Sequence, residues 1–277
     1  MSNTDTQTNP IVPTEGWHVI HLFYQIDHTQ WSLLSDDEQL KAKTDLSILI
    51  QEIRSTPKTQ LLSFSIVTPK ADIGFMLLTD DLHLANSFEK QLTLALGADI
   101  LTPSFSYLSM TETGDYMTTP EEYSENTLKA DRNLTEGSDE YESALNEFKS
   151  HMAKYTNDKL YPNMPDWPVF CFYSMGKRRG EVFNWYALPF DERKRLMAEH
   201  GKVGRQWAGK IRQLITGSVG LDDSEWGVTL FANNSYDIKG IVYKMRYDEV
   251  SVKYAEFGDF YIGLQLPLDQ LFRRVGL

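Results

Sequence analysis

A phenol and an ammonium group lie close together in residues 170–177, Phe-Cys-Phe-Tyr-Ser-Met-Gly-Lys. The apolar part predicts a β-strand, whose alternation sends Tyr173 and Met175 to one face and Phe172 to the other. This strand is expected to meet a flexible cationic turn that carries Lys177. Tyr173 is then either an edge tyrosine whose hydroxyl caps the sheet or a phenol that exchanges protons or electrons with an anionic substrate beside Lys177.

His200 is the second residue that could do chemistry. A helix over 189–200 is predicted, because Pro189 suits a first helical turn and Asp191 and Glu192 complement the helix dipole. His200 then falls near the helix end, where the dipole favours an imidazolium. The alternative is a neutral imidazole that binds a haem iron as its axial ligand. No second histidine or cysteine is near in sequence, so a mononuclear zinc site is not expected.

The segment 177–213 is basic in a protein that is acidic overall. It carries ten basic and four acidic residues, a net charge of +6, whereas the whole chain has −12. Any one of these basic residues is more often simply solvated, but together they indicate an anionic small ligand, since ammonium and guanidinium groups recognise carboxylates and phosphates. Nucleic acid is the weaker alternative, because the rest of the surface would repel a long polyanion.

The elements that must position these residues fall into two halves of the same order, β-α-β-β-α-β. In the first half the long helix starts at Ser35, which forms a capping box with Glu38. The second half runs from the strand at 169–175 to a strand at 256–264, with helical segments at 189–200 and Val203–Thr216. We predict an α+β fold in which two ferredoxin-like repeats pack their sheets together in one chain. An unrelated α+β domain of the same element order is the alternative.

Composition bounds the remaining classes. The chain has 277 residues, 41% of them hydrophobic, and no stretch of about 20 uncharged apolar residues that a membrane helix needs. Its single cysteine, Cys171, excludes a disulfide framework and is expected to be buried and inert. With neither a secretory nor a transit signal apparent, a cytoplasmic location without membrane contact is expected.

Four segments are expected: a disordered tail over 1–15, an N-terminal half over 16–110, an acidic connector over 111–158 and a C-terminal half over 159–277. From 111 to 150 there are eleven acidic and three basic residues, a net charge of −8. A solvated linker with a helix around 141–154 is favoured over a regulatory segment.

The chain resembles the chlorite dismutase-like superfamily, and in particular its coproheme decarboxylases of Gram-positive type. The resemblance extends from Gly16 to about Pro267. It rests on motifs spread over both halves: Gly16-Trp17, Lys70-Ala-Asp72, Thr102-Pro-Ser-Phe-Ser-Tyr107, Leu160-Tyr-Pro162, Cys171-Phe-Tyr173, Lys177-Arg-Arg179, Asn184-Trp-Tyr186, Glu199-His-Gly201, Ile215-Thr-Gly-Ser-Val-Gly-Leu-Asp-Asp223, Glu225-Trp-Gly-Val-Thr-Leu-Phe231 and Met245-Arg-Tyr-Asp-Glu-Val-Ser251.

The resemblance implies a two-repeat α+β barrel, a homopentamer, and a porphyrin held only by the C-terminal half. It implies His200 as the iron ligand, Tyr173 as the tyrosine that becomes a radical and attacks the propionates, and Lys177 as the lysine beside it. It further implies substrate contacts at Lys159, Met175, Gln213, Arg246 and Ser251.

Three positions depart from the family pattern. Lys159 stands where arginine is usual, which keeps the charge but loses the bidentate fork. The usual proline after the tyrosine is Ser174, and Gly176 precedes Lys177; this pair is expected to loosen the turn that presents Lys177.

The implied function is the peroxide-dependent oxidative decarboxylation of iron-coproporphyrin III to haem b, the last step of coproporphyrin-dependent haem biosynthesis. Coproheme and hydrogen peroxide are the implied ligands, and a transient contact with ferrochelatase is a further implied partnership. The alternatives are a non-enzymatic haem-binding or haem-transfer protein and a chlorite dismutase. Chlorite dismutases carry arginine where Gln213 stands; Arg212 is adjacent, but on a helix it would point about 100° away.

Overall fold

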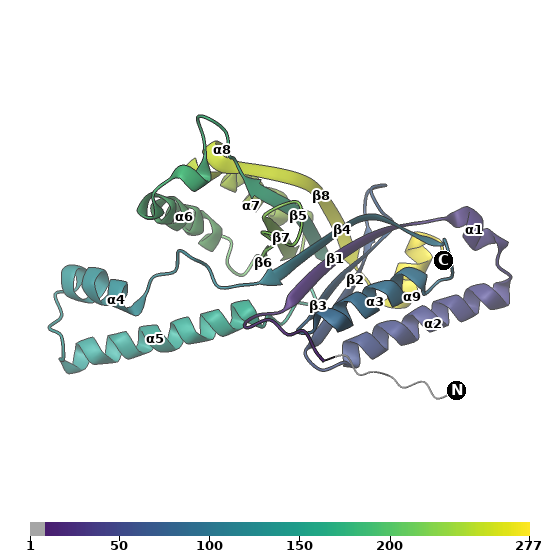
Figure 1. The fold of residues 1–277 in the computed structure, drawn as a ribbon, viewed down its shortest axis with the longest axis horizontal. Coiled ribbons are helices and arrows are strands. Elements are labelled where there is room, and N and C mark those ends of the chain that lie inside the picture. Colours follow the sequence, from purple (N-terminus) through teal and green to yellow (C-terminus); the bar gives the residue numbers. More distant parts are fainter. Residues whose placement is uncertain (1–8) are drawn as a thin grey trace.

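A computed structural model of the chain describes residues 9–277. Within this range eight antiparallel strands close into one barrel, in the order β1-β3-β2-β8-β5-β7-β6-β4. Figure 1 shows the two halves of the chain side by side in this barrel. The strands are β1 (His18–Ile26), β2 (Thr59–Ile66), β3 (Ile73–Thr79), β4 (Leu101–Thr111), β5 (Val169–Lys177), β6 (Ile211–Gly217), β7 (Trp226–Ala232) and β8 (Ala255–Gln265).

The predicted α+β fold with two ferredoxin-like repeats is confirmed. In each half the first and third strands are central, the second and fourth are at the edges, and the edges pair between halves, β2 with β8 and β4 with β6. The helices of the repeats are α2 (Asp36–Ser55) and α3 (Leu82–Leu94) in the first half, and α6 (Phe190–Arg205) and α7 (Ser235–Met245) in the second. The predicted capping box of Ser35 and Glu38 is present at the start of α2.

The predicted helix over Val203–Thr216 is wrong. Helix α6 continues through Gly201 to Arg205, and the chain then turns at Gly209, whose φ of +80° favours glycine. Ile211–Gly217 forms β6, which pairs with β7 along its whole length and with the end of β4. Neighbouring residues on a strand point to opposite faces, so Arg212 and Gln213 are separated by the sheet rather than by a helical turn.

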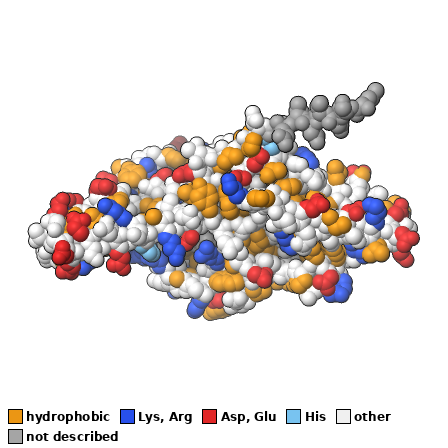
Figure 2. Space-filling view, turned by 90° about the horizontal axis from the view of Figure 1, so that it is seen from below, with side chains coloured by type: hydrophobic (Ala, Val, Ile, Leu, Met, Phe, Trp, Pro, Cys, Tyr) orange, Lys and Arg blue, Asp and Glu red, His pale blue; other side chains and the backbone are white. Residues whose placement is uncertain are grey.

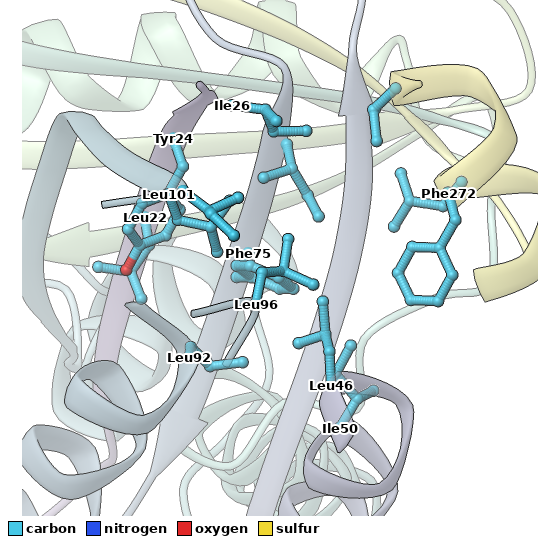
Figure 3. Close-up of a cluster of buried hydrophobic side chains, with 14 of the residues drawn as sticks. Leu22, Tyr24, Ile26, Leu46, Ile50, Phe75, Leu92, Leu96, Leu101 and Phe272 are labelled. Carbon is cyan, nitrogen blue, oxygen red and sulfur yellow. The ribbon is translucent and has the colours of Figure 1, made fainter. Parts of the chain in front are cut away.

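The core has separate layers inside and outside the barrel. Inside, phenylalanines from both halves stack, and Phe64 lies 3.9 Å from Phe170 between ring centroids. Outside the N-terminal half, α2, α3 and α9 (Leu268–Val275) cover the sheet, and Figure 3 shows Leu46 of α2 and Phe272 of α9 in that layer with Phe75. The side chains of this layer fill the outer face of the N-terminal sheet.

The segment between the halves forms a projecting arm (Figure 1). The predicted helix of this segment is α5 (Asp139–Leu160), which runs antiparallel to α4 (Pro120–Glu122) and the π-helical turn Tyr123–Asp131. Tyr123 and Phe148 stack at 4.0 Å and hold the arm together. Acidic side chains gather at its outer end (Figure 2).

The remaining helices are short. They are α1 (His28–Leu33), the 3-10 turn Trp185–Ala187, and α8 (Glu249–Tyr254). None of the helices in residues 9–277 combines the length and the apolar composition needed to cross a membrane. At the N-terminus, Ile11 donates a backbone hydrogen bond to Asp81 at 3.0 Å, and residues 1–8 of the predicted tail lie outside the described residues.

Candidate active site

A cavity lies on the outer face of the C-terminal sheet, between β5, β6 and β7 and the helices α6, α7 and α8. Its empty space, open mouth included, is about 1280 Å³. Seven of the eight residues predicted from the sequence line it: Lys159, Tyr173, Met175, Lys177, His200, Gln213 and Ser251. The apolar side chains Ile215, Val228, Leu230 and Ile241 form much of its wall. A flat apolar ligand with polar edges suits such a surface.

His200 is held by a carboxylate from another helix. Its Nδ1 lies 2.9 Å from Oδ2 of Asp248, the residue that caps α8 and also accepts hydrogen bonds from the backbone and hydroxyl of Ser251. Burial alone would raise the pKa of Asp248, but the hydrogen bonds from His200 and Ser251 lower it, so the carboxylate stays charged. With Nδ1 engaged, Nε2 is the ring nitrogen left to bind a metal, the arrangement typical of metal-binding histidines.

The prediction that His200 ends its helix is wrong, because α6 runs five residues further, to Arg205. Gly201 lies within the helix and does not stop it. The side chain therefore projects from the helix body toward Asp248, and the interaction with a helix end that the sequence suggested is replaced by a specific hydrogen bond.

Tyr173 is buried in the wall of the cavity. Its side chain is 6% exposed and its ring stacks on Phe260 at 4.4 Å. Burial raises the pKa of its hydroxyl well above the ordinary value, so the phenol is protonated at neutral pH. Cys171, on the same face of β5, is fully buried with a pKa raised to about 12, which confirms the expected inert thiol.

Lys177 is 8% exposed, and its Nζ lies 4.6 Å from the centroid of the Trp185 ring. Burial lowers its pKa to about 8, against the opposing charges of Asp248 and Glu225. Burial likewise lowers the pKa of Lys159 despite Glu112 and Asp115. Neither ammonium forms an ion pair with a carboxylate within residues 9–277. Two cationic groups that face an apolar cavity without partners favour an anionic ligand.

The predicted turn before Lys177 is wrong. Strand β5 extends to Lys177, and its last two residues pair with Glu256 and Ala255 of β8. The bulge lies earlier, between Tyr173 and Met175. Because hydrogen bonds on the ladder fix the backbone there, a glycine does not free it as it would in an open turn.

Of the predicted substrate contacts, Gln213 lines the cavity and Arg246 does not. Gln213 points into the cavity from β6, and Arg212 does not line it. Arg246 also lies outside the cavity, at the end of α7, where its guanidinium stacks on Phe257 at 4.4 Å in a neighbouring groove with Arg178. The ring of Phe257 lines the cavity from its other side, so Arg246 is one side chain away from it.

Several functional positions escaped the sequence reasoning. The segment that follows β4, Glu112–Tyr116, lines the cavity, although the sequence assigned it to a solvated connector. Lys159 reaches in beside it, and its Nζ would lie 3.2 Å from a Cβ placed on Gly114, so the glycine leaves room for the ammonium. Tyr116 and Glu122 bind Arg193 and Lys194 of α6. The pairing of β4 with β6 brings residues 112–116 to the cavity, and that pairing could not be inferred from the sequence of the segment itself.

Fold and site together define a two-repeat α+β barrel with a cavity on the C-terminal half that offers an oriented imidazole and two lysines without an ion-pair partner in residues 9–277. Comparison with known proteins agrees with this class. A family model described as chlorite dismutase matches residues 39–266. The chain belongs to the chlorite dismutase family.

Among its relatives, the coproheme decarboxylase of Staphylococcus saprophyticus is 38% identical over 93% of this chain and 94% of its own length. The coproheme decarboxylase of Staphylococcus carnosus is 36% identical over the same shares. Among solved structures, a heme-binding protein from Thermus thermophilus superposes with a TM-score of 0.78 at 33% identity, covering 98% of this chain and all of its own.

Proposed function

We propose that this protein is a coproheme decarboxylase, which converts iron-coproporphyrin III to haem b with hydrogen peroxide as oxidant. The observation that carries the proposal is the meeting, in one cavity, of a protonated buried phenol, an unpaired ammonium and an imidazole oriented by a carboxylate. The coproheme decarboxylases among its relatives support the same assignment.

The residues present fit an iron porphyrin with carboxylate edges. His200 would bind the iron through Nε2, since Asp248 occupies Nδ1. The apolar wall would cover the macrocycle, and Lys177 and Lys159 would pair with carboxylates at its edge. Ser251, Met175 and Gln213 are proposed as further contacts, and Arg246 as a propionate partner that approaches past Phe257.

Bound together with peroxide, the iron porphyrin supplies the oxidising equivalents for the reaction. Tyr173 would give up its hydroxyl hydrogen as a proton and an electron, and its radical would then abstract a hydrogen atom from the propionate carbon next to the ring. Lys177 would hold the carboxylate beside Tyr173 until carbon dioxide leaves and the electron left on the substrate passes to the second oxidising equivalent. Per propionate, one peroxide and one proton are consumed, and one vinyl group, one carbon dioxide and two waters are formed.

The burial of Tyr173 serves this role in a specific way. A phenol whose pKa is raised keeps its hydrogen in the resting protein, so that the hydrogen leaves only when an oxidant removes the electron as well. The positive charge of Lys177 is available at neutral pH because its pKa, although lowered, is about 8.

The same proposal includes assembly and location. We propose that only the C-terminal half binds the porphyrin, because the equivalent outer face of the N-terminal sheet is filled by the layer that contains Leu46 and Phe272. A homopentamer, a transient contact with ferrochelatase and a cytoplasmic location complete the proposal, and they rest on the family resemblance.

The two alternatives have lost their support. Haem transfer without catalysis would gain slight support from a loose turn before Lys177, but that residue lies in β5, where it pairs with Ala255 of β8. Chlorite dismutation is disfavoured by Gln213, which stands where chlorite dismutases carry arginine, and the adjacent Arg212 does not line the cavity.

The test is to add peroxide to the purified complex with ferric coproheme and to follow the porphyrin mass. Loss of two carboxyl groups is the expected result. A porphyrin that keeps all four carboxyl groups, or that is only bleached, would refute the enzymatic function.

A further inference from the structure

Glu225 immediately precedes β7 and lies beside the end of β5. It does not line the cavity. Its backbone joins two neighbouring segments: its N–H donates to the carbonyl of Met175 at 3.1 Å, and its carbonyl accepts the N–H of Ser218 at 2.8 Å. The residue is therefore fixed to β5 and to the connection that follows β6 before its side chain makes any contact.

The Glu225 carboxylate is buried, with 8% of the side chain exposed. Oε2 accepts the backbone N–H of Lys177 at 2.6 Å, and Oε1 pairs with the exposed Arg179 at 3.1 Å. A Cβ placed on Gly176 would lie 3.5 Å from Oε2, in ordinary contact distance. A buried carboxylate is costly unless it is paired and hydrogen-bonded. The hydrogen bond from the Lys177 backbone N–H therefore indicates that the Glu225 carboxylate has a specific structural role.

We propose that Glu225 is a positioning residue for Lys177, which it anchors through the backbone and keeps charged through its own negative charge. This inference rests on the proposed function, because Lys177 is the group that would hold the substrate carboxylate. Glu225 itself would touch neither the substrate nor Tyr173. The hydrogen bond supplies the fixed geometry that a proline before Lys177 would otherwise give.

Few charged groups surround Lys177 and Glu225. Lys177 has Asp248 and Glu225 as its charged neighbours and Trp185 against its ammonium. Glu225 faces Arg179, and Tyr186 lies beside it. Removal of the Glu225 charge is therefore expected to leave Lys177 with one carboxylate in place of two.

The first measurement uses the ligand-free protein. Competitive acetylation at a series of pH values, read by peptide mass spectrometry, gives the midpoint at which Lys177 becomes reactive. The wild type is expected at about 8. Glu225→Gln keeps an oxygen that can accept the Lys177 N–H but removes the charge, and it should lower the midpoint. Arg179→Gln removes an exposed charge from the other side of Glu225 and should leave the midpoint unchanged.

The second variant separates geometry from charge. Glu225→Asp keeps the charge but is one methylene too short to reach the Lys177 N–H. It should raise the limiting acetylation rate of Lys177 at high pH, because the residue loses its anchor, and it should slow decarboxylation while coproheme affinity stays close to that of the wild type. The alkaline limb of the decarboxylation rate should move to lower pH in Glu225→Gln by the same shift as the acetylation midpoint.

An unchanged acetylation midpoint in Glu225→Gln would overturn the proposal, and so would a wild-type limiting rate in Glu225→Asp. If Glu225→Gln does not fold, the limiting rate in Glu225→Asp decides. A wild-type protein that binds coproheme but releases no carbon dioxide would refute the proposed function, and the acetylation data would still decide the role of Glu225.

Discussion

The charge of Asp248 should control how firmly His200 binds the iron of coproheme. The replacement Asp248→Asn isolates this charge, because asparagine caps a helix about as well as aspartate. It can still accept the N–H of Ser251, which lies 3.0 Å from the carboxylate in the wild-type structure. What it loses is the negative partner of the His200 Nδ1–H, now 2.9 Å away. The fold should therefore survive while the imidazole becomes a weaker and less well oriented ligand.

Loss of such an outer partner typically costs 10–100-fold in metal affinity, about 1.4–2.7 kcal/mol. Titration of the ligand-free protein with ferric coproheme, followed by the Soret band, measures this loss, and the shape of the band reports whether the iron is still bound by imidazole. The melting temperature should change little, because the helix cap is kept.

Asp81→Asn is the matched control. Asp81 caps α3 in the N-terminal half and accepts the N–H of His83 at 3.0 Å, so the chemical change is the same and lies far from the cavity. It should leave the titration unaltered. If Asp248→Asn bound coproheme with wild-type affinity and an unaltered Soret band, the reasoning that makes His200 the ligand through Nε2 would be refuted.

Three further predictions follow from buried groups. Tyr173→Phe should bind coproheme as the wild type does yet keep all carboxyl groups when peroxide is added; full turnover would rule out a Tyr173 radical as the species that abstracts the hydrogen. Turnover should decline as the pH rises through about 8, where Lys177 loses its charge, and Lys177→Gln should lose this alkaline limb along with most of the rate. His21 is fully buried inside the barrel, and burial lowers its pKa to about 3. Because the unfolded chain binds a proton there near pH 6.5, stability should fall by about 2 kcal/mol between pH 6.5 and 5 in urea titrations, and equal stability at both values would contradict this.

The sequence predicted most elements of the barrel because local signals marked them. The capping box at Ser35 fixed the start of α2, and the strands predicted at 169–175 and 256–264 lie within β5 and β8. It failed at β6, where Val203, Trp207 and Ile211 follow each other at the spacing of a helix. Leu214 packs inside the barrel and Ile215 outside it, so the strand is apolar on both faces and lacks the alternation that would reveal it.

For the site as well, sequence reasoning found the residues that share one strand and missed those that long-range packing brings in. Tyr173 and Met175 lie on one strand, so alternation alone placed both in the cavity. Asp248 and Glu225 escaped notice because each acts on a residue 48 positions away, and only the closed barrel and the packing of α8 against α6 bring them there. Carboxylates that orient other groups carry no sequence pattern of their own.

The basic segment 177–213 shows why net charge is a weak guide to a ligand. Four of its ten basic residues form ion pairs within the protein: Arg179, Lys194, Arg195 and Lys202. Arg195 binds Glu192 and Glu249, and Lys194 binds Glu122 on the arm. Of its ten basic residues only Lys177 lines the cavity, and the second lysine that does, Lys159, lies outside the segment, at the end of α5. An exposed ion pair contributes little to binding, whereas a buried ammonium without a partner gains a strong interaction when a carboxylate arrives. The anionic ligand is therefore indicated by two lysines that lack ion-pair partners in the described part of the chain, whereas Lys194 and Arg195 fasten α6, which carries His200, to the arm and to α8.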